Sequence, residues 1–255
     1  MQGTVSRLLG TSLLATGVLL GASVFSPANA FTVVNNNQTG GNPTSSDIFE
    51  VQGLVEGDFF NVNWLLEEGT VSNDNDTVPV DLTATATFQV IAIDNGLLQL
   101  AVSIANTTNP GSYTERLSLT ALGLTTGNNT VTSVAFDTQG NTFDGVSTAN
   151  FPAFPTDLCV FTGPNCAGGG NPNESLNPGD SDSFILNISG DFVDNQAVTL
   201  DTFATKWQTG NGSFEFPGTP DGEKVPEPST TAALGLLGLA SLKFLKKRKG
   251  NSELN

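Results

Sequence analysis

A strict alternation of apolar and polar residues constrains the fold of this chain more than any other feature. Apolar residues occupy every second position from Leu82 to Val90, and threonine or glutamine fills the positions between them. A period of two places the two sets of side chains on opposite faces of a β-strand. Asp94-Asn95-Gly96 is a signal for a tight turn, and a second alternating run extends from Leu98 to Ile104. The segment therefore predicts an antiparallel hairpin with one buried face.

Similar short signals recur through the central region and are separated by turns such as Asn109-Pro110-Gly111. They occur at Phe59–Leu66, Arg116–Leu124, Val131–Phe136, Ser183–Ser189, Ala197–Gln208 and Ser213–Phe216. Together they predict about eight or nine strands, as in an antiparallel β-sandwich or jelly roll. One all-β domain over residues 31–216 is therefore expected.

Residues 137–182 lose the alternation and are rich in glycine, proline and asparagine, so we expect one long excursion between strands. Both cysteines of the chain, Cys159 and Cys166, lie in it. Two cysteines in an exported chain predict a disulfide, which here closes a short loop. Ligation of a metal is a poor alternative, because there is no histidine and no second cysteine pair.

Residues 1–30 are typical of a signal peptide. Arg7 precedes an apolar run from Leu8 to Phe25, and Ala28 and Ala30 form the small-x-small pattern that signal peptidase accepts. Phe31 is then the expected mature N-terminus. The alternative is an uncleaved membrane anchor, but three glycines and two threonines dilute the apolar run.

The C-terminal region has three parts in a fixed order after a Pro- and Gly-rich linker at residues 217–224. The motif Pro226-Glu227-Pro228, flanked by Val225 and Ser229, is held extended by its prolines. The apolar stretch 230–245 would span about 24 Å as a transmembrane helix, somewhat short of a hydrocarbon core of about 30 Å. A basic cluster then stays in the cytoplasm by the positive-inside rule. It consists of Lys243, Lys246, Lys247, Arg248 and Lys249.

Residues 225–250 resemble the PEP-CTERM sorting signal, because motif, helix and basic cluster follow one another at the C-terminal end. The resemblance implies processing by an exosortase-type enzyme, with Val225–Ser229 as the recognition motif. It also implies a precursor held transiently in the inner membrane and a mature form outside it. An ordinary tail anchor behind a Pro-rich linker is the alternative.

Three further runs are similar to a group of cyanobacterial PEP-CTERM proteins, the cistern family. They are LCVFTGPNCAGGGN, NPGDSDSFILNISG and KWQTGNGSFEFPG, within residues 45–217. This family has no established activity, so the resemblance implies no chemistry.

The charge of the domain excludes nucleic acid as a partner. Residues 31–230 carry 24 acidic and three basic side chains, whereas polyphosphate binding needs a basic surface. The negative net charge favours solubility outside the cell and could also attract divalent cations. Asp74-Asn75-Asp76 and Asp180-Ser181-Asp182 could supply oxygen ligands to calcium, but neither forms a complete EF-hand loop. No metal and no cofactor are expected.

The absence of histidine from the chain excludes Ser-His-Asp and Cys-His catalysis and most zinc hydrolases. Carboxylate pairs could hydrolyse glycosides, but acids in Gly- and Ser-rich surroundings are usually solvated turn residues. The candidate pairs are Glu67/Glu68, Asp180/Asp182 and Asp191/Asp194. Trp64 and Trp207 could stack on sugar rings, but their apolar surroundings favour core packing.

These observations favour a non-enzymatic, exported protein of the cell envelope or extracellular matrix, either attached to extracellular polysaccharide or released into it. A carbohydrate- or calcium-binding adhesion module on the same scaffold is the alternative, and a glycoside hydrolase is a third hypothesis.

Deleting Pro226–Pro228 tests the sorting hypothesis. Since the two prolines hold the recognition motif extended, we expect the deletion to leave a longer precursor in the membrane fraction. Immunoblots of membrane and extracellular fractions measure this, and deletion of Ser252–Leu254 is a control of equal length. A mature protein of unchanged size and location would show that the sorting hypothesis is wrong.

Overall fold

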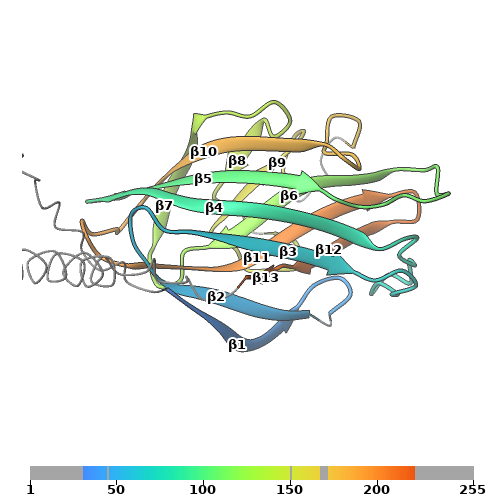
Figure 1. The fold of residues 1–255 in the computed structure, drawn as a ribbon, viewed down its shortest axis with the longest axis horizontal. Coiled ribbons are helices and arrows are strands. Elements are labelled where there is room, and N and C mark those ends of the chain that lie inside the picture. Colours follow the sequence, from blue (N-terminus) through green and yellow to red (C-terminus); the bar gives the residue numbers. More distant parts are fainter. Residues whose placement is uncertain (1–30, 45, 150, 167–171, 222–255) are drawn as a thin grey trace, which may run out of the picture.

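The computed structural model of the protein describes residues 31–44, 46–149, 151–166 and 172–221 (Figure 1). These residues contain no helix and form two packed antiparallel sheets, which confirms the predicted all-β sandwich. The strands are β1 (Thr32–Gly40), β2 (Ser46–Leu54), β3 (Phe59–Leu66), β4 (Leu82–Asp94), β5 (Leu97–Asn106), β6 (Leu117–Thr125), β7 (Val131–Thr138), β8 (Gly145–Ser147), β9 (Leu158–Phe161), β10 (Ser181–Gly190), β11 (Val198–Thr209), β12 (Ser213–Pro217) and β13 (Thr219–Pro220). The described part of the chain thus has 13 strands, more than the eight or nine predicted.

The two sheets differ in how consecutive strands are arranged. The six-stranded sheet has the order β13-β3-β4-β5-β10-β7, so β3, β4 and β5 form an antiparallel meander that contains the predicted hairpin. The seven-stranded sheet has the order β1-β2-β11-β6-β9-β8, and β12 also pairs with β11. Each sheet therefore combines strands from both halves of the chain.

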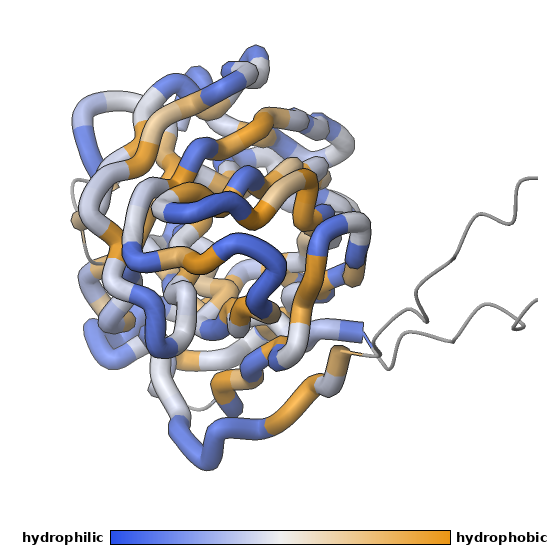
Figure 2. The backbone as a smooth tube through the Cα atoms, turned by 90° about the vertical axis from the view of Figure 1, so that its left-hand side faces the viewer, coloured by the Kyte–Doolittle hydropathy of each residue, from blue (hydrophilic) through white to orange (hydrophobic). Residues whose placement is uncertain are grey.

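The β4–β5 hairpin forms where the alternation and the turn signal predict it. Asp94 pairs with Leu97, so Asn95 and Gly96 make a two-residue turn, and Gly96 has a φ of 84°. Glycine suits this position because it adopts positive φ without steric cost. Burial alternates along most of both strands, and the buried set packs against the other sheet. Figure 2 shows hydrophobic and hydrophilic stretches of the backbone interleaved through the sandwich.

Aromatic rings fill the space between the sheets. Phe60 of β3 stacks on Phe88 of β4 with ring centroids 5.3 Å apart, and Phe203 of β11 packs against both rings. Trp64 and Trp207 are 2% and 0% exposed. Their indole N–H groups donate to the carbonyl of Phe203 (2.7 Å) and to Thr205 Oγ1 (3.1 Å). Core packing of both tryptophans is confirmed, so neither is a platform for a sugar ring.

The excursion between β7 and β10 contains two strands that the sequence analysis missed. Strands β8 and β9 extend the seven-stranded sheet beyond β6. All four residues of β9 are buried. A strand covered on both faces has a continuous apolar run in place of an alternation, and LCVF is such a run.

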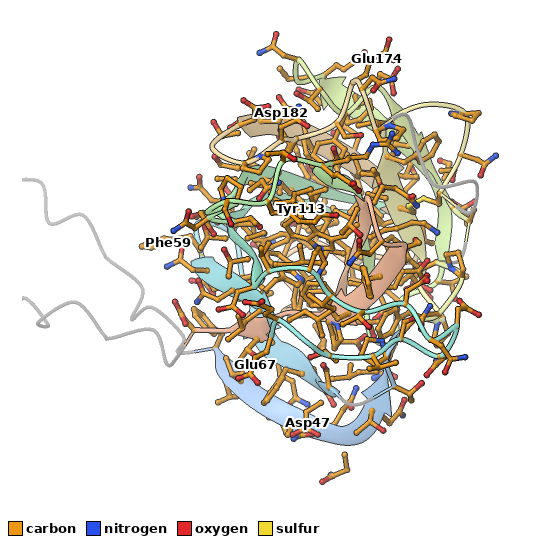
Figure 3. The ribbon with its side chains drawn as sticks, turned by 90° about the vertical axis from the view of Figure 1, so that its right-hand side faces the viewer. Asp47, Phe59, Glu67, Tyr113, Glu174 and Asp182 are labelled. Carbon is orange, nitrogen blue, oxygen red and sulfur yellow. A yellow bond between two sulfur atoms is a disulfide. The ribbon has the colours of Figure 1, made fainter. Side chains whose placement is uncertain are left out.

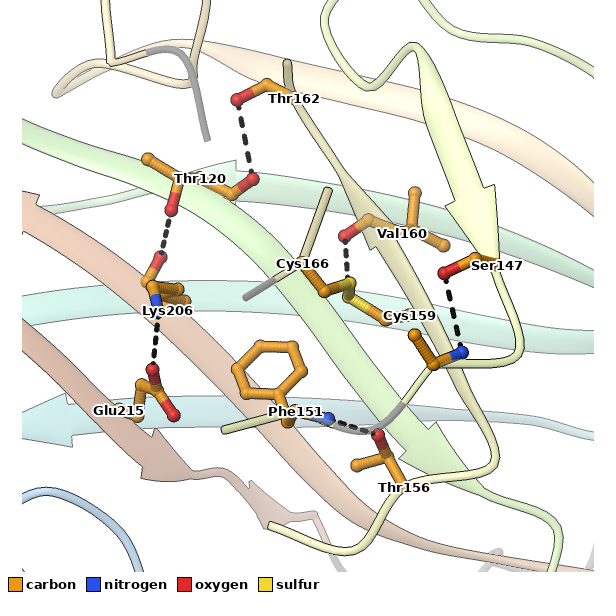
Figure 4. Close-up of a disulfide and its surroundings, with 11 residues drawn as sticks. Thr120, Ser147, Phe151, Thr156, Cys159, Val160, Thr162, Cys166, Lys206 and Glu215 are labelled. Carbon is orange, nitrogen blue, oxygen red and sulfur yellow. Dashed lines mark hydrogen bonds and ion pairs between the residues drawn. A yellow bond between two sulfur atoms is a disulfide. The ribbon is translucent and has the colours of Figure 1, made fainter. Parts of the chain in front are cut away.

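The rest of the excursion covers the outer face of the seven-stranded sheet. Phe151 and Phe154 are buried against Ala121 of β6 and Ala204 of β11 in a second, smaller core. The predicted disulfide between Cys159 and Cys166 is present in this layer, and both residues are buried (Figure 4). It ties the excursion to its own strand β9.

One ion pair lies under the same layer. Lys206 Nζ of β11 is 2.7 Å from Glu215 Oε1 of β12, and both side chains are almost fully buried (Figure 4). Glu215 Oε2 also accepts the backbone N–H of Ala153 at 2.9 Å. A buried carboxylate needs such partners to offset the cost of leaving water, so Glu215 couples the β11–β12 hairpin to the excursion.

The domain continues beyond Phe216, so the predicted boundary and the predicted linker start at 217 are wrong. Pro217 pairs with Ala204 in the seven-stranded sheet, whereas Thr219 and Pro220 pair with β3 in the other sheet. Gly218 makes the crossing and donates its N–H to the carbonyl of Phe203 at 2.8 Å. A segment rich in proline and glycine is typical of a linker, but here residues 217–220 cross from one sheet to the other and pair in both.

Two truncated variants with different C-terminal ends test this boundary. A chain that ends at Phe216 loses the strand that covers Val62 and Trp64, whereas a chain that ends at Asp221 keeps it. We expect the shorter chain to lose about 2–4 kcal/mol of unfolding free energy, from apolar exposure and lost hydrogen bonds. Urea titration followed by tryptophan fluorescence measures the difference, and equal midpoints would contradict the assignment.

Candidate functional site

The outer face of the six-stranded sheet carries a shallow trough along β4 and β5. Nearly every second residue of these strands points to this face, and the outward side chains in the middle of β5, Ala101, Ser103 and Ala105, are small. The floor of this β4–β5 trough consists of Thr83, Thr85, Thr87 and Gln89 of β4, of Ala101, Ser103 and Ala105 of β5, and of Thr107 directly after β5. From Gln89 to Thr83 the trough is about 20 Å long at the rise of a β-strand.

The pairing register produces the trough. Ala101, Ser103 and Ala105 lie opposite Gln89, Thr87 and Thr85, respectively. Longer side chains stand on the neighbouring strands: Phe59, Asn61, Asn63 and Leu65 on β3, and Ile185 and Asn187 on β10. Two hollows of about 310 and 320 Å³ follow one another along this strip and share Thr87 and Ser103.

Hydrogen bonds between neighbouring strands orient the polar groups of this face. Thr87 Oγ1 donates to Asn61 Oδ1 (2.8 Å), and Ser183 Oγ donates to Ser103 Oγ (2.9 Å). Gln99 Nε2 similarly donates to Asn187 Oδ1 at 3.0 Å. Each group keeps further donor or acceptor capacity for a ligand.

The residues of β4 and β5 that form the floor of the β4–β5 trough carry no charge, although the domain is strongly acidic. Asp221 lines the hollow of about 320 Å³ from its edge. The nearest carboxylates stand at its margins and are engaged by flanking amides. Asn63 donates to Asp221 at 2.8 Å, and Asn187 donates to Asp137 at 3.2 Å. The floor of the trough therefore offers hydroxyl and amide groups without a fixed charge, and the carboxylate of Asp221 at its edge is already hydrogen-bonded to Asn63.

At one end the trough opens into a cleft of about 600 Å³ between two loops. This end cleft is lined by Glu68, Pro79, Val80 and Asp81 before β4, by Thr83 and Thr107 at its base, and by Asn109–Tyr113 after β5. Thr107 Oγ1 donates to Thr83 Oγ1 at 3.0 Å and so joins the base to the trough. Both loops belong to the right-hand end of the sandwich in Figure 1.

Tyr113 is the single tyrosine of the chain and lines the end cleft. Its ring also packs against the main core, so it is only partly exposed. Burial, together with the nearby charge of Glu115, raises the pKa of Tyr113 above its ordinary value. The phenol therefore stays neutral at physiological pH.

Four of the carboxylates predicted as catalytic or calcium ligands, Asp74, Asp180, Asp182 and Asp191, stabilise turns and loops. Asp182 is 4% exposed and accepts the backbone N–H groups of Asn141, Thr142 and Phe143 at 2.8–3.1 Å. Asp180 Oδ2 accepts the N–H of Asn177 at 3.1 Å. Figure 3 shows Asp182 well apart from Glu67, on another part of the molecule.

Asp191 and Asp74 also serve local structure. Asp191 Oδ1 accepts the N–H of Thr130 at 2.6 Å, and Asp74 Oδ2 accepts Asn42 Nδ2 at 3.3 Å. The N–H groups of Asp74 and Asp76 both donate to Ser72 Oγ, which shapes that turn. Within the described ranges no three His, Cys, Asp or Glu side chains gather as they would around a metal ion.

The residues predicted to direct sorting lie outside the described residues. They are the signal cleavage residues Ala28 and Ala30, the motif Val225–Ser229 and the basic cluster at 243–249. In the part of the chain that the structure describes, no helix is long and apolar enough to cross a membrane.

Comparisons with known protein families, curated proteins and solved structures found no match for this chain.

The sequence analysis identified the residues of the trough as the solvent face of a hairpin and missed their arrangement as a site. The signal present in the sequence was a strip of Thr, Ser and Gln without Lys or Glu. Tyr113 was not singled out, although it is the one tyrosine and lies two residues after the turn Asn109-Pro110-Gly111. Its position in the end cleft depends on the loop before β4, which is distant in the sequence.

Asp182→Asn separates the structural role of this carboxylate from a role as calcium ligand. An amide cannot accept three N–H groups equally well, so we expect a loss of about 1–3 kcal/mol of unfolding free energy. The exposed Asp180→Asn should cost about 0.5 kcal/mol or less. Thermal unfolding with and without calcium measures both. A calcium-dependent rise in Tm that either variant abolishes would contradict the structural role.

Proposed function

We propose that this chain is a non-enzymatic, exported protein of the cell envelope or extracellular matrix, and that its β4–β5 trough binds extracellular polysaccharide. The observation that carries the proposal is the long, uncharged strip of hydroxyl and amide groups on an otherwise acidic domain. Sugar hydroxyls both donate and accept hydrogen bonds, as do Thr, Ser, Asn and Gln side chains. The strip therefore matches an extended neutral polymer.

The walls of the trough add apolar surface to these polar groups. Phe59 and Leu65 on β3 are 58% and 56% exposed and lie on the same face as Asn61 and Asn63. Sugar rings present apolar C–H faces as well as hydroxyl edges, so exposed apolar side chains beside polar groups are suitable partners. The flanking strand β3 supplies both kinds of contact.

Both ends of the domain lie against the half of β3 that is farther from the end cleft. The ring of Phe31 lies 6.0 Å from that of Phe60, and Asp221 donates its N–H to the carbonyl of Asn61 at 2.8 Å. A tether attached at either end would leave the end cleft facing away from its point of attachment. This geometry supports presentation of the trough to an external polymer.

The sorting part of the proposal rests on the resemblance of residues 225–250 to the PEP-CTERM signal. Signal peptidase would release the chain after Ala30, and the apolar stretch would hold it in the inner membrane until an exosortase-type enzyme processes it. The mature domain would then lie outside this membrane, where polysaccharide is the available polymer.

Ser103→Arg tests the trough as a binding site. The long side chain would fill the middle of the strip from an exposed, outward position. We expect at least about tenfold weaker binding, or about 1.4 kcal/mol, of hydroxyethylcellulose, glucomannan or soluble starch in affinity electrophoresis. Thr32→Arg on edge strand β1 of the other sheet is the matched control. Failure of the unaltered protein to bind any neutral polysaccharide, or equal binding by Ser103→Arg, would overturn the proposal.

A further inference from the structure

The end cleft has the chemistry to distinguish one kind of sugar from another, which the uniform strip of the trough lacks. Glu68 and Asp81 bring two carboxylates to its wall, whereas the floor of the trough on β4 and β5 has none and only Asp221 stands beside one of its hollows. Tyr113 brings an aromatic ring to the other wall, and the hydroxyls of Thr83 and Thr107 form the base. Acidic, aromatic and hydroxyl groups thus converge on one space.

Hydrogen bonds hold both walls of the cleft in place before any ligand arrives. Asp81 Oδ1 accepts the N–H of Glu68 at 2.8 Å, which ties together the two ends of the loop between β3 and β4. In the other wall, the N–H of Tyr113 donates to the carbonyl of Pro110 at 2.8 Å. A preformed site loses less conformational entropy on binding than a site that must be ordered.

The groups of the cleft favour a neutral sugar over an acidic one. A carboxylate accepts hydrogen bonds from sugar hydroxyls, and such charge-assisted bonds are stronger than neutral ones. The same carboxylates repel the carboxylate of a uronic acid, and the surrounding domain adds to this repulsion. The partly exposed ring of Tyr113 offers a face on which the C–H side of a sugar can pack.

We propose that the end cleft is a subsite for one neutral sugar unit of the chain held in the β4–β5 trough, and that it rejects a uronic acid unit. The inference rests on the proposed function, since it assigns selectivity to one end of the same site. Glu68 and Asp81 accept hydroxyl hydrogen bonds, and Tyr113 packs against the ring.

The experiment compares neutral hexasaccharides with their acidic counterparts on the purified full-length chain. The probes are cellohexaose, mannohexaose and maltohexaose, and the form of each in which C6 is oxidised to a carboxylate. We expect the neutral form that binds to be preferred at least about fivefold at low salt, with a smaller preference at high salt because salt screens the repulsion. Isothermal titration calorimetry measures the affinities.

Variants assign the preference to the cleft. Glu68→Gln combined with Asp81→Asn should abolish most of the preference, whereas Glu56→Gln with Asp94→Asn removes two exposed charges at the other end and should retain it. Tyr113→Ala should weaken hexasaccharide binding about tenfold, and Tyr113→Phe should restore most of it, because the ring face supplies the contact.

The outcomes separate the two proposals. If a neutral hexasaccharide binds but none of the cleft variants changes affinity or preference, the end cleft is not a subsite and the trough proposal stands. If no hexasaccharide and no neutral polysaccharide binds the unaltered chain, the proposed function fails and this inference fails with it.

Discussion

Strand β11 is covered on both faces, and the rest of the structure depends on this. Its inward side chains Phe203 and Trp207 pack into the core between the sheets, while Lys206 points outward into the layer formed by the excursion. The same strand pairs with β2, β6 and β12. Apolar burial is the main favourable term in folding, so a doubly covered strand anchors three neighbours at once. The disulfide and the buried ion pair both lie on the outer side of β11, in the layer formed by the excursion. There they help to hold the excursion against the seven-stranded sheet.

The two sheets consequently have different outer faces. The excursion closes the face of the seven-stranded sheet, which leaves the six-stranded sheet as the open face of the domain. Hydroxyl and amide side chains are enriched on that open face, and most acidic side chains lie in loops and at strand ends. This separation matters for function because a polymer rich in hydroxyl groups needs partners that donate and accept hydrogen bonds without a field that repels it.

Much of the fold could be predicted because the half-buried strands have a period of two. The alternation at residues 82–90 and 98–104 predicted β4 and β5, and Asn95-Gly96 predicted their turn. Strand β9 escaped prediction because both of its faces are covered, so its residues do not alternate. Strand β13 escaped because Pro217 and Gly218 resemble a linker, although this segment crosses between the sheets. Strand β1 was missed for another reason: its asparagine-rich run lies at a sheet edge, where little of it is buried.

The sequence by itself determined the class of fold, the burial of both tryptophans, the disulfide and the neutral chemistry of the strip along β4 and β5. These follow from periodicity, composition and spacing, which act over a few residues and need no knowledge of distant partners. Only the tertiary structure decided which sheet face stays open, where the domain ends and that Tyr113, Glu68 and Asp81 share one cleft. Those properties depend on contacts between segments far apart in the chain, and no local pattern encodes which loops meet at the end of a sandwich.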